Sequence, residues 1–243
     1  MKNYTILFAA LCMTFTTYAQ WGKKIKGNGK VVTIERSTGD YDGVAVSGWF
    51  DVNLVNGNEG NVTIKGEENL LEYLITEVRN DKLVIKPKKG YYLSPSSWKS
   101  GGIEVTVPVK EIREVSLSGS GDSVGKTALN ADIFTASMSG SGDITLDIDA
   151  NDLDVSLSGS GDITLEGSAN DLDISISGSG DVKAYELKAK NVTANVSGSA
   201  DIKVTATESL NAKVSGSGDI YYKGNPKVQS KTSGSGDITK TNK

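Results

Sequence analysis

The sequence predicts an all-β chain wound as a right-handed, single-chain β-solenoid, a β-helix-like rod with about 18–21 residues in each coil. Three observations support this fold class. The unit Ser-Gly-Ser-Gly-Asp returns seven times, at steps of 21, 19, 19, 20, 18 and 18 residues, with one altered copy that reads SGSAD. Apolar and polar residues alternate on both sides of each copy, as on β-strands with one buried face. No segment between the copies has a 3.6-residue period long enough for a crossover helix.

Residues 1–19 are predicted to be a secretory signal peptide. Lys2 is followed by an apolar run over residues 6–15, and the segment ends in Thr17-Tyr18-Ala19, with small residues three and one before the expected cut. Leu11, which precedes the single cysteine Cys12, is not small, which argues against a lipoprotein signal. We therefore expect an exported protein that resides in the periplasm, on the outer surface or in the medium.

The composition of the mature chain, which would begin at Gln20, excludes several functions. Removing residues 1–19 leaves 25 basic against 30 acidic residues, a net charge of −5 without a basic stripe, so a nucleic-acid partner is not expected. The mature chain has no cysteine and no histidine, which rules out thiol and imidazole nucleophile chemistry. No other apolar run reaches about 18 residues, so no transmembrane segment is expected in the mature chain.

Residues 20–112 are predicted to form a more irregular, β-rich part that is continuous with the stack. Strand-like runs lie at residues 31–34, 44–46, 52–55, 62–64, 83–86 and 103–107, separated by Gly, Asn and Asp turns. Between them, "EENLLEYLITEV" permits either a short helix or an irregular strand entry. "VSGWFDVNL" at residues 46–54 is a diverged version of "LSGSGDITL", which suggests that the stack begins here.

Residues 113–243 are predicted to form the regular solenoid. Leu153, Val155 and Leu157 precede one SGSGD unit, and Ile163 and Leu165 follow it, so the aliphatic side chains should stack inward in ladders about 4.8 Å apart. In the last copy, polar residues replace this apolar pattern, as expected for a terminal repeat that blunts an open edge. These are Ser230, Thr232 and Lys240.

The aspartates of the repeats should form a ladder along the outside of one corner. Neighbouring carboxylates about 5 Å apart repel by roughly 0.8 kcal/mol in water and about 3 kcal/mol at an effective dielectric of 20, so they need partners. The partners could be backbone N–H groups together with Lys183 and Lys203. A bound calcium ion is the other possibility, although the known calcium-binding nonapeptide repeats every nine residues. No other cofactor, no catalytic residue and no other metal site is indicated. The predicted turn ladder is Asp122, Asp143, Asp162, Asp181, Asp201, Asp219 and Asp237.

One insertion, "KPKKGYYLSPSSWKSGG" at residues 86–102, interrupts two strands and carries Tyr91, Tyr92 and Trp98 among lysines. Two interpretations remain open. The aromatic side chains cover one end of the stack, or they form a ligand-binding platform, since aromatic faces suit sugar rings. Trp49 and Phe50 are expected in the core or in a cap.

The residues match a known family. The segments "YDGVAVSGWFDVNLVNG", "NVTIKGEENLLEYLITEV", "DKLVIKP" and "IEVTVP", together with the serial SGSGD turns, resemble the head GIN domain family of auto-transporter adhesins, common in secreted proteins of Bacteroidetes. The resemblance implies an extracytoplasmic β-solenoid and a role in adhesion, and it supplies no catalytic or ligand residues.

Three classes of function follow. A non-catalytic binding or adhesion module for cell-surface or matrix glycans or proteins fits best, because a rigid rod, a repeated surface and a secretion signal are all present. A structural envelope protein is the alternative. A polysaccharide-active β-helix enzyme is less favoured, because the carboxylates recur in every coil whereas a catalytic pair is unique.

Overall fold

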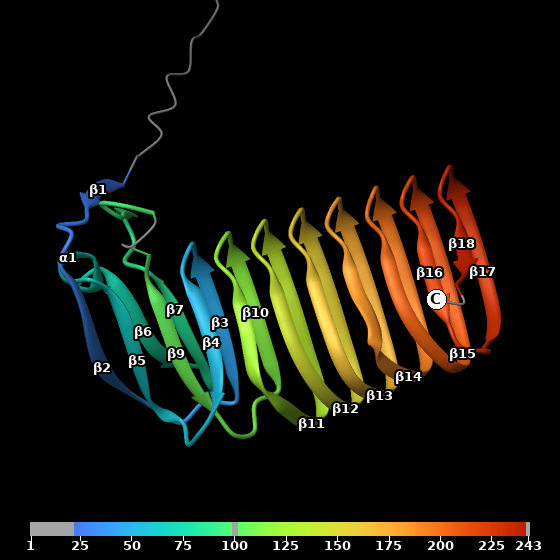
Figure 1. Ribbon diagram of the computed structural model, residues 1–243, viewed down its shortest axis with the longest axis horizontal. Helices are drawn as coiled ribbons and strands as arrows, with labels where there is room; N and C mark the ends of the chain where they lie inside the picture. Colours follow the sequence, from blue (N-terminus) through green and yellow to red (C-terminus); the bar gives the residue numbers. More distant parts are fainter. Residues whose placement is uncertain (1–21, 99–101, 242–243) are drawn as a thin grey trace, which may run out of the picture.

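The computed structural model describes residues 22–98 and 102–241. The predicted signal peptide, with Cys12, lies outside these residues. The described chain forms a long row of stacked β-coils with a less regular end that contains the N-terminal half (Figure 1). In the described part, no helix is long and apolar enough to cross a membrane.

Residues 114–240 form a β-solenoid of about seven turns, which confirms the predicted fold class. Each strand pairs in parallel with its equivalent in the next coil, for example Leu157 with Ile176 and Ser158 with Ser177. The strands are β10 (Glu114–Gly119), β11 (Ser123–Gly140), β12 (Ile144–Gly159), β13 (Ile163–Gly178), β14 (Val182–Gly198), β15 (Ile202–Gly216), β16 (Ile220–Lys223), β17 (Lys227–Gly234) and β18 (Ile238–Lys240).

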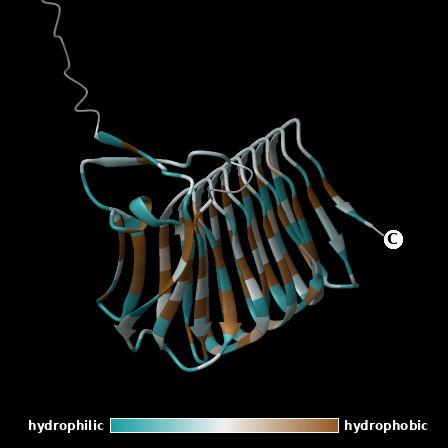
Figure 2. Ribbon diagram, turned by 60° about the vertical axis from the view of Figure 1, so that its left-hand side comes forward, coloured by the Kyte–Doolittle hydropathy of each residue, from teal (hydrophilic) through white to brown (hydrophobic). Residues whose placement is uncertain are grey.

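The alternating residues build the core as predicted. Figure 2 shows hydrophobic and hydrophilic residues alternating along each strand. The first residue after the glycine corner is Ile144, Ile163 or Val182 in three successive coils, and each is fully buried. Burying such a side chain contributes roughly 1.5–3 kcal/mol, which is repeated in every coil. Ser123 takes this position one coil earlier, where its buried hydroxyl has no hydrogen-bond partner.

The N-terminal half adds coils out of sequence order. β3 pairs with β10 in the register Ser47 to Ser118, and β4 pairs with β11, so residues 43–56 make a coil aligned with the repeats. β7 and β9 pair in parallel with β3 and β4 on the opposite side. The elements are β1 (Lys23–Lys26), β2 (Val31–Gly39), β3 (Gly43–Gly48), β4 (Asp51–Asn56), β5 (Gly60–Glu67), α1 (Glu68–Leu71), β6 (Leu74–Arg79), β7 (Lys82–Pro87), β8 (Tyr91–Ser94) and β9 (Glu104–Val109).

Antiparallel strands close this end of the rod. β6 pairs with β7, β5 pairs with β9, and β2 pairs with β5, all antiparallel. The ambiguous segment at residues 67–78 contains both predicted forms, the four-residue helix α1 and then β6. Arg36 of β2 joins the two by donating hydrogen bonds of 2.5 Å to the carbonyl oxygens of Leu71 and Leu74. The strands β1 and β8 were not predicted from the sequence.

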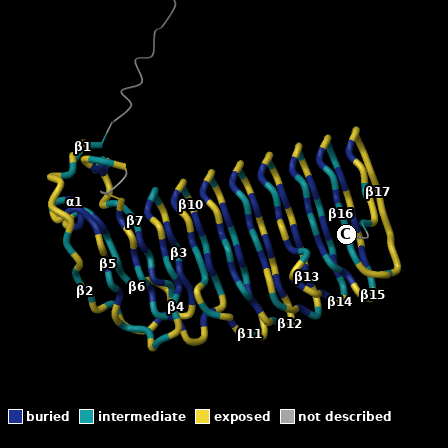
Figure 3. The backbone as a smooth tube through the Cα atoms, in the orientation of Figure 1, coloured by how far each residue is buried: buried dark blue, intermediate teal, exposed yellow. Residues whose placement is uncertain are grey.

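The C-terminal end remains open. All eight residues of β17 are exposed, and Figure 3 shows this strand exposed at the edge of the stack, beside strands with buried residues. Val228, at an inward position, is 37% exposed. Lys227 and Lys231 flank this edge, and charged edge residues discourage pairing with other chains.

Candidate functional site

The insertion at residues 86–102 connects β7 to β9, so it stands where an SGSGD corner stands in the later coils. Within it, β8 pairs in parallel with β1, the first described strand of the chain. This two-stranded sheet lies at the same edge of the rod as the row of glycine corners (Figures 1 and 2). The insertion therefore converts one corner of the solenoid into a larger surface feature.

The three predicted aromatic residues do not share one face. Successive residues of a strand point to opposite sides, and in β8 Leu93 is buried whereas Tyr92 is 55% exposed. Tyr91 is half-buried against Tyr73, with a distance of 4.5 Å between the ring centroids. Trp98 is 66% exposed. Tyr92 and Trp98 are thus available to a ligand, and Tyr91 chiefly supports β8.

Trp49 and Phe50 form the floor under this surface. The pairing of Gly48 with Gly119 places Trp49 at the position of a corner serine. Phe50 is fully buried, and its ring centroid lies 5.4 Å from that of Trp49, as the expected core or cap role requires. The indole N–H of Trp49 donates to the carbonyl oxygen of Leu93 at 3.1 Å, and Trp98 packs edge-on against Trp49 with 5.1 Å between centroids.

A buried carboxylate, Glu67, holds the insertion against the N-terminal segment. Its Oε1 accepts the backbone N–H of Ser96 at 2.7 Å, and its Oε2 accepts that of Gly29 at 2.5 Å. Burial by itself would raise the pKa of Glu67, but the hydrogen bonds from Gly29 and Ser96 outweigh it and the pKa is lowered. A side chain at Gly27 would displace this carboxylate from its two hydrogen bonds, because a Cβ there would lie 2.2 Å from Oε2.

Sequence reasoning missed Glu67. The residue ends a strand next to a second glutamate, Glu68, and no periodicity distinguishes the two. Glu68 is exposed and pairs with Lys30 at 2.9 Å, whereas Glu67 is fully buried. Only the three-dimensional approach of residues 29 and 96 separates their roles.

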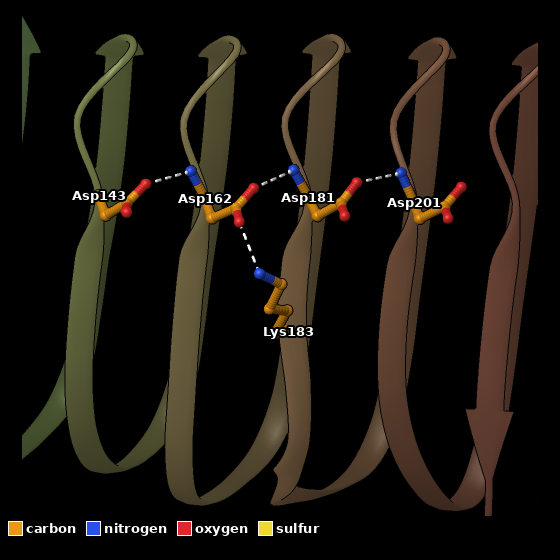
Figure 4. A network of polar contacts seen from close by, with 5 residues as sticks. All are labelled: Asp143, Asp162, Asp181, Lys183 and Asp201. Atoms are coloured by element: carbon orange, nitrogen blue, oxygen red, sulfur yellow. Dashed lines mark hydrogen bonds and ion pairs between the residues drawn. The ribbon is translucent and has the colours of Figure 1, made fainter. Parts of the chain in front are cut away.

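The corner aspartates form a continuous chain of hydrogen bonds along the rod. In each coil, Oδ1 of the aspartate accepts the backbone N–H of the aspartate in the next coil (Figure 4). The chain begins at Asp51, before the first SGSGD unit. Its distances lie between 2.7 and 3.1 Å. The members are Asp51, Asp122, Asp143, Asp162, Asp181, Asp201, Asp219 and Asp237.

In two coils, a neighbouring side chain also binds the second carboxylate oxygen, Oδ2, of the corner aspartate. Lys183 Nζ lies 2.6 Å from Asp162 Oδ2, on the preceding coil, and the hydroxyl of Tyr221 donates to Asp219 Oδ2 at 2.8 Å. Burial opposes ionisation of Asp162, but the hydrogen bonds from Lys183 and Asp181 prevail and lower its pKa. The bond to Asp219 raises the pKa of Tyr221 to about 12. Over the described ranges, no group of three or more His, Cys, Asp or Glu residues is placed to hold a metal ion.

Comparison with known proteins identifies relatives of this chain. Residues 40–226 match a protein family described as "Putative auto-transporter adhesin, head GIN domain". A crystal structure from Parabacteroides distasonis, described as a putative lipid binding protein, shares 30% identity and a TM-score of 0.74 over 90% of this chain and 100% of that one. A putative adhesin from Bacteroides fragilis has a TM-score of 0.83 at 24% identity, over 89% of this chain and 100% of that one. No curated protein matches.

Proposed function

Because this chain belongs to the head GIN domain family of auto-transporter adhesins, we propose that it is a non-catalytic adhesion module that acts outside the cytoplasm. The rod is the scaffold, and the binding surface is formed by residues 91–98 of the insertion. The partners of this surface are glycans or proteins of a cell surface or matrix, bound through Tyr92 and Trp98, while Tyr91 supports β8 by packing against Tyr73.

One observation carries the proposal: the two most exposed aromatic side chains of the described residues sit on a braced segment. Tyr92 is 55% exposed and Trp98 is 66% exposed. Glu67 and Trp49 hold the backbone of this segment at Ser96 and Leu93. A rigid aromatic anchor loses little conformational entropy on binding, which favours affinity.

The arrangement of the carboxylates along the rod argues against a catalytic role and so favours a binding module. A glycosidase needs one unique pair of acids at a defined separation, whereas Oδ1 of every corner aspartate from Asp51 to Asp219 already accepts a backbone N–H. This repetition favours a scaffold role for the ladder.

We expect Trp98→Ala and Tyr92→Ala to weaken binding of residues 20–243 to an array of glycans, matrix proteins and lipid vesicles, each by roughly tenfold or more. Lipid vesicles belong on the array because one relative is described as a lipid binding protein. The melting temperature should change little, because both side chains are exposed.

Ile133→Ala is the matched control, since Ile133 is 52% exposed and belongs to β11 rather than to the insertion. Unchanged binding in both aromatic variants would refute the assignment of the site. A loss of stability in Trp98→Ala would show that Trp98 is a cap. An array without any hit would favour a structural envelope protein.

A further inference from the structure

The surface around Tyr92 is strongly basic, although the whole chain has a formal net charge of −4. β1 and the turn before β8 carry five lysines, all of them exposed. Within the described residues, none of these five forms an ion pair. We call them the lysine cluster: Lys23, Lys24, Lys26, Lys88 and Lys89.

The register of β1 and β8 places lysine and aromatic side chains together. Lys24 pairs with Tyr92 and Lys26 pairs with Ser94 across the two parallel strands. Paired residues of neighbouring strands point to the same face, so Lys24 and Tyr92 lie side by side on the outer surface. Lys88 Nζ lies 5.8 Å from the ring centroid of Tyr91.

Two carboxylates of the adjoining segment, Glu67 and Glu68, have partners outside the cluster. Glu67 is fully buried and accepts hydrogen bonds from Gly29 and Ser96. Glu68 pairs with Lys30, which is not a member of the cluster. The positive charge of the cluster therefore faces solvent, where it attracts an anionic partner and raises the rate of encounter.

We propose that the ligand of this surface is an anionic polysaccharide, whose sugar rings contact Tyr92 and Trp98 while its carboxylate or sulfate groups bind Lys24, Lys26 and their neighbours. The inference rests on the proposed function and specifies its ligand class. A membrane surface fits less well, because an interfacial site needs an apolar face to enter the lipid. Among the described residues of β1, β8 and the insertion, Tyr92 and Trp98 are the only large apolar side chains that are exposed, and no aliphatic side chain accompanies them.

The test uses residues 20–243 and two matched probes, dextran sulfate and uncharged dextran. We expect binding to dextran sulfate, weakening as salt is raised, and weaker or no binding to dextran. The double variant Lys24→Glu/Lys26→Glu should lower affinity for dextran sulfate by roughly tenfold or more. Lys88→Glu/Lys89→Glu, in the turn, should act in the same direction without touching β1.

Lys227→Glu/Lys231→Glu on β17 is the control, because it changes the net charge equally at the opposite end of the rod. Equal losses in this control and in the cluster variants would overturn the inference, since binding would then follow overall charge. Equal affinity for dextran and dextran sulfate, lost in Trp98→Ala, would overturn the inference and leave the proposed function standing. Binding to phosphatidylglycerol vesicles but to neither probe would identify a membrane partner and refute the polysaccharide.

Discussion

At the residue scale, the aspartate of each SGSGD unit is best understood as an acceptor for backbone groups. Asp162 Oδ1 accepts the N–H of Asp181 at 3.0 Å, and its Oδ2 lies 2.6 Å from Lys183 Nζ. The hydrogen bond to Oδ1 repeats along the rod because parallel coils place each of these carboxylates beside the backbone N–H of the next coil. The carboxylates are thus partnered, which offsets part of their mutual repulsion.

We expect Asp162→Ala to lower the free energy of unfolding by about 1–2 kcal/mol, because it leaves the Asp181 N–H without its acceptor. Asp162→Asn keeps an oxygen at this position and should cost less than about 1 kcal/mol. Ser160→Ala, two residues away on the same exposed corner, is the control for both. Urea unfolding followed by circular dichroism measures the three values.

The pH dependence gives a second readout of the same site. The pKa of Asp162 is lowered in the folded protein, so its ionised carboxylate stabilises the fold. This contribution is fully present above the unfolded pKa of about 4 and is lost as the pH falls through the folded pKa. The stability difference between the wild type and Asp162→Asn should therefore narrow at acidic pH. A difference that stays constant down to the acid range would contradict a charge-based role.

At the element scale, the glycine corner depends on two glycines with different requirements. The first, Gly159 in one coil, has φ of +152° and a Cβ there would lie 2.0 Å from the carbonyl oxygen of Gly140. At the second, Gly161, an added Cβ would lie 1.8 Å from the carbonyl oxygen of Gly142. Its equivalent in a later coil is nevertheless Ala200, which is fully buried. The second position can therefore accommodate a methyl group after a local shift.

Gly159→Ala should lower the free energy of unfolding by more than about 3 kcal/mol, because it combines backbone strain with a clash against the neighbouring coil. Gly161→Ala should lower the free energy of unfolding by less, about 1–2 kcal/mol. The corner that contains Ala200 still forms the hydrogen bond from the backbone N–H of Ser199 to the carbonyl oxygen of Gly178, at 3.0 Å. Thermal melts of the two variants test the order. If Gly161→Ala were the more damaging, this account of the corner would fail.

At the scale of the whole molecule, the strands of each coil pair with those of the coils next to it, and the N-terminal end has a structure that the repeats do not share. The regular coils are interchangeable in register, as the pairing of Ser158 with Ser177 illustrates. The N-terminal end is not interchangeable, because the coil at residues 43–56 is enclosed between β7 and β9 on one side and β10 and β11 on the other. Stability should therefore scale with coil number only within the repeat.

Deleting residues 159–177 joins Ser158 to Gly178 and removes one whole coil in register. We expect this variant to fold cooperatively, with a denaturant m-value lower by roughly a tenth. Deleting only residues 159–168 removes about half a coil, misaligns the ladders and should prevent folding. Circular dichroism and urea unfolding distinguish the two. Folding of the half-coil deletion would contradict the observed register.

The regular solenoid could be predicted from the sequence, because a period near 19 and strict alternation specify strands, corners and inward faces coil by coil. The sequence also located the insertion and its aromatic residues. Three contacts were visible only in three dimensions: Tyr91 packs against Tyr73, Glu67 accepts the N–H of Ser96, and Lys24 lies beside Tyr92. These contacts join single segments far apart in the chain, and a feature that occurs once leaves no repeat from which its partners can be read.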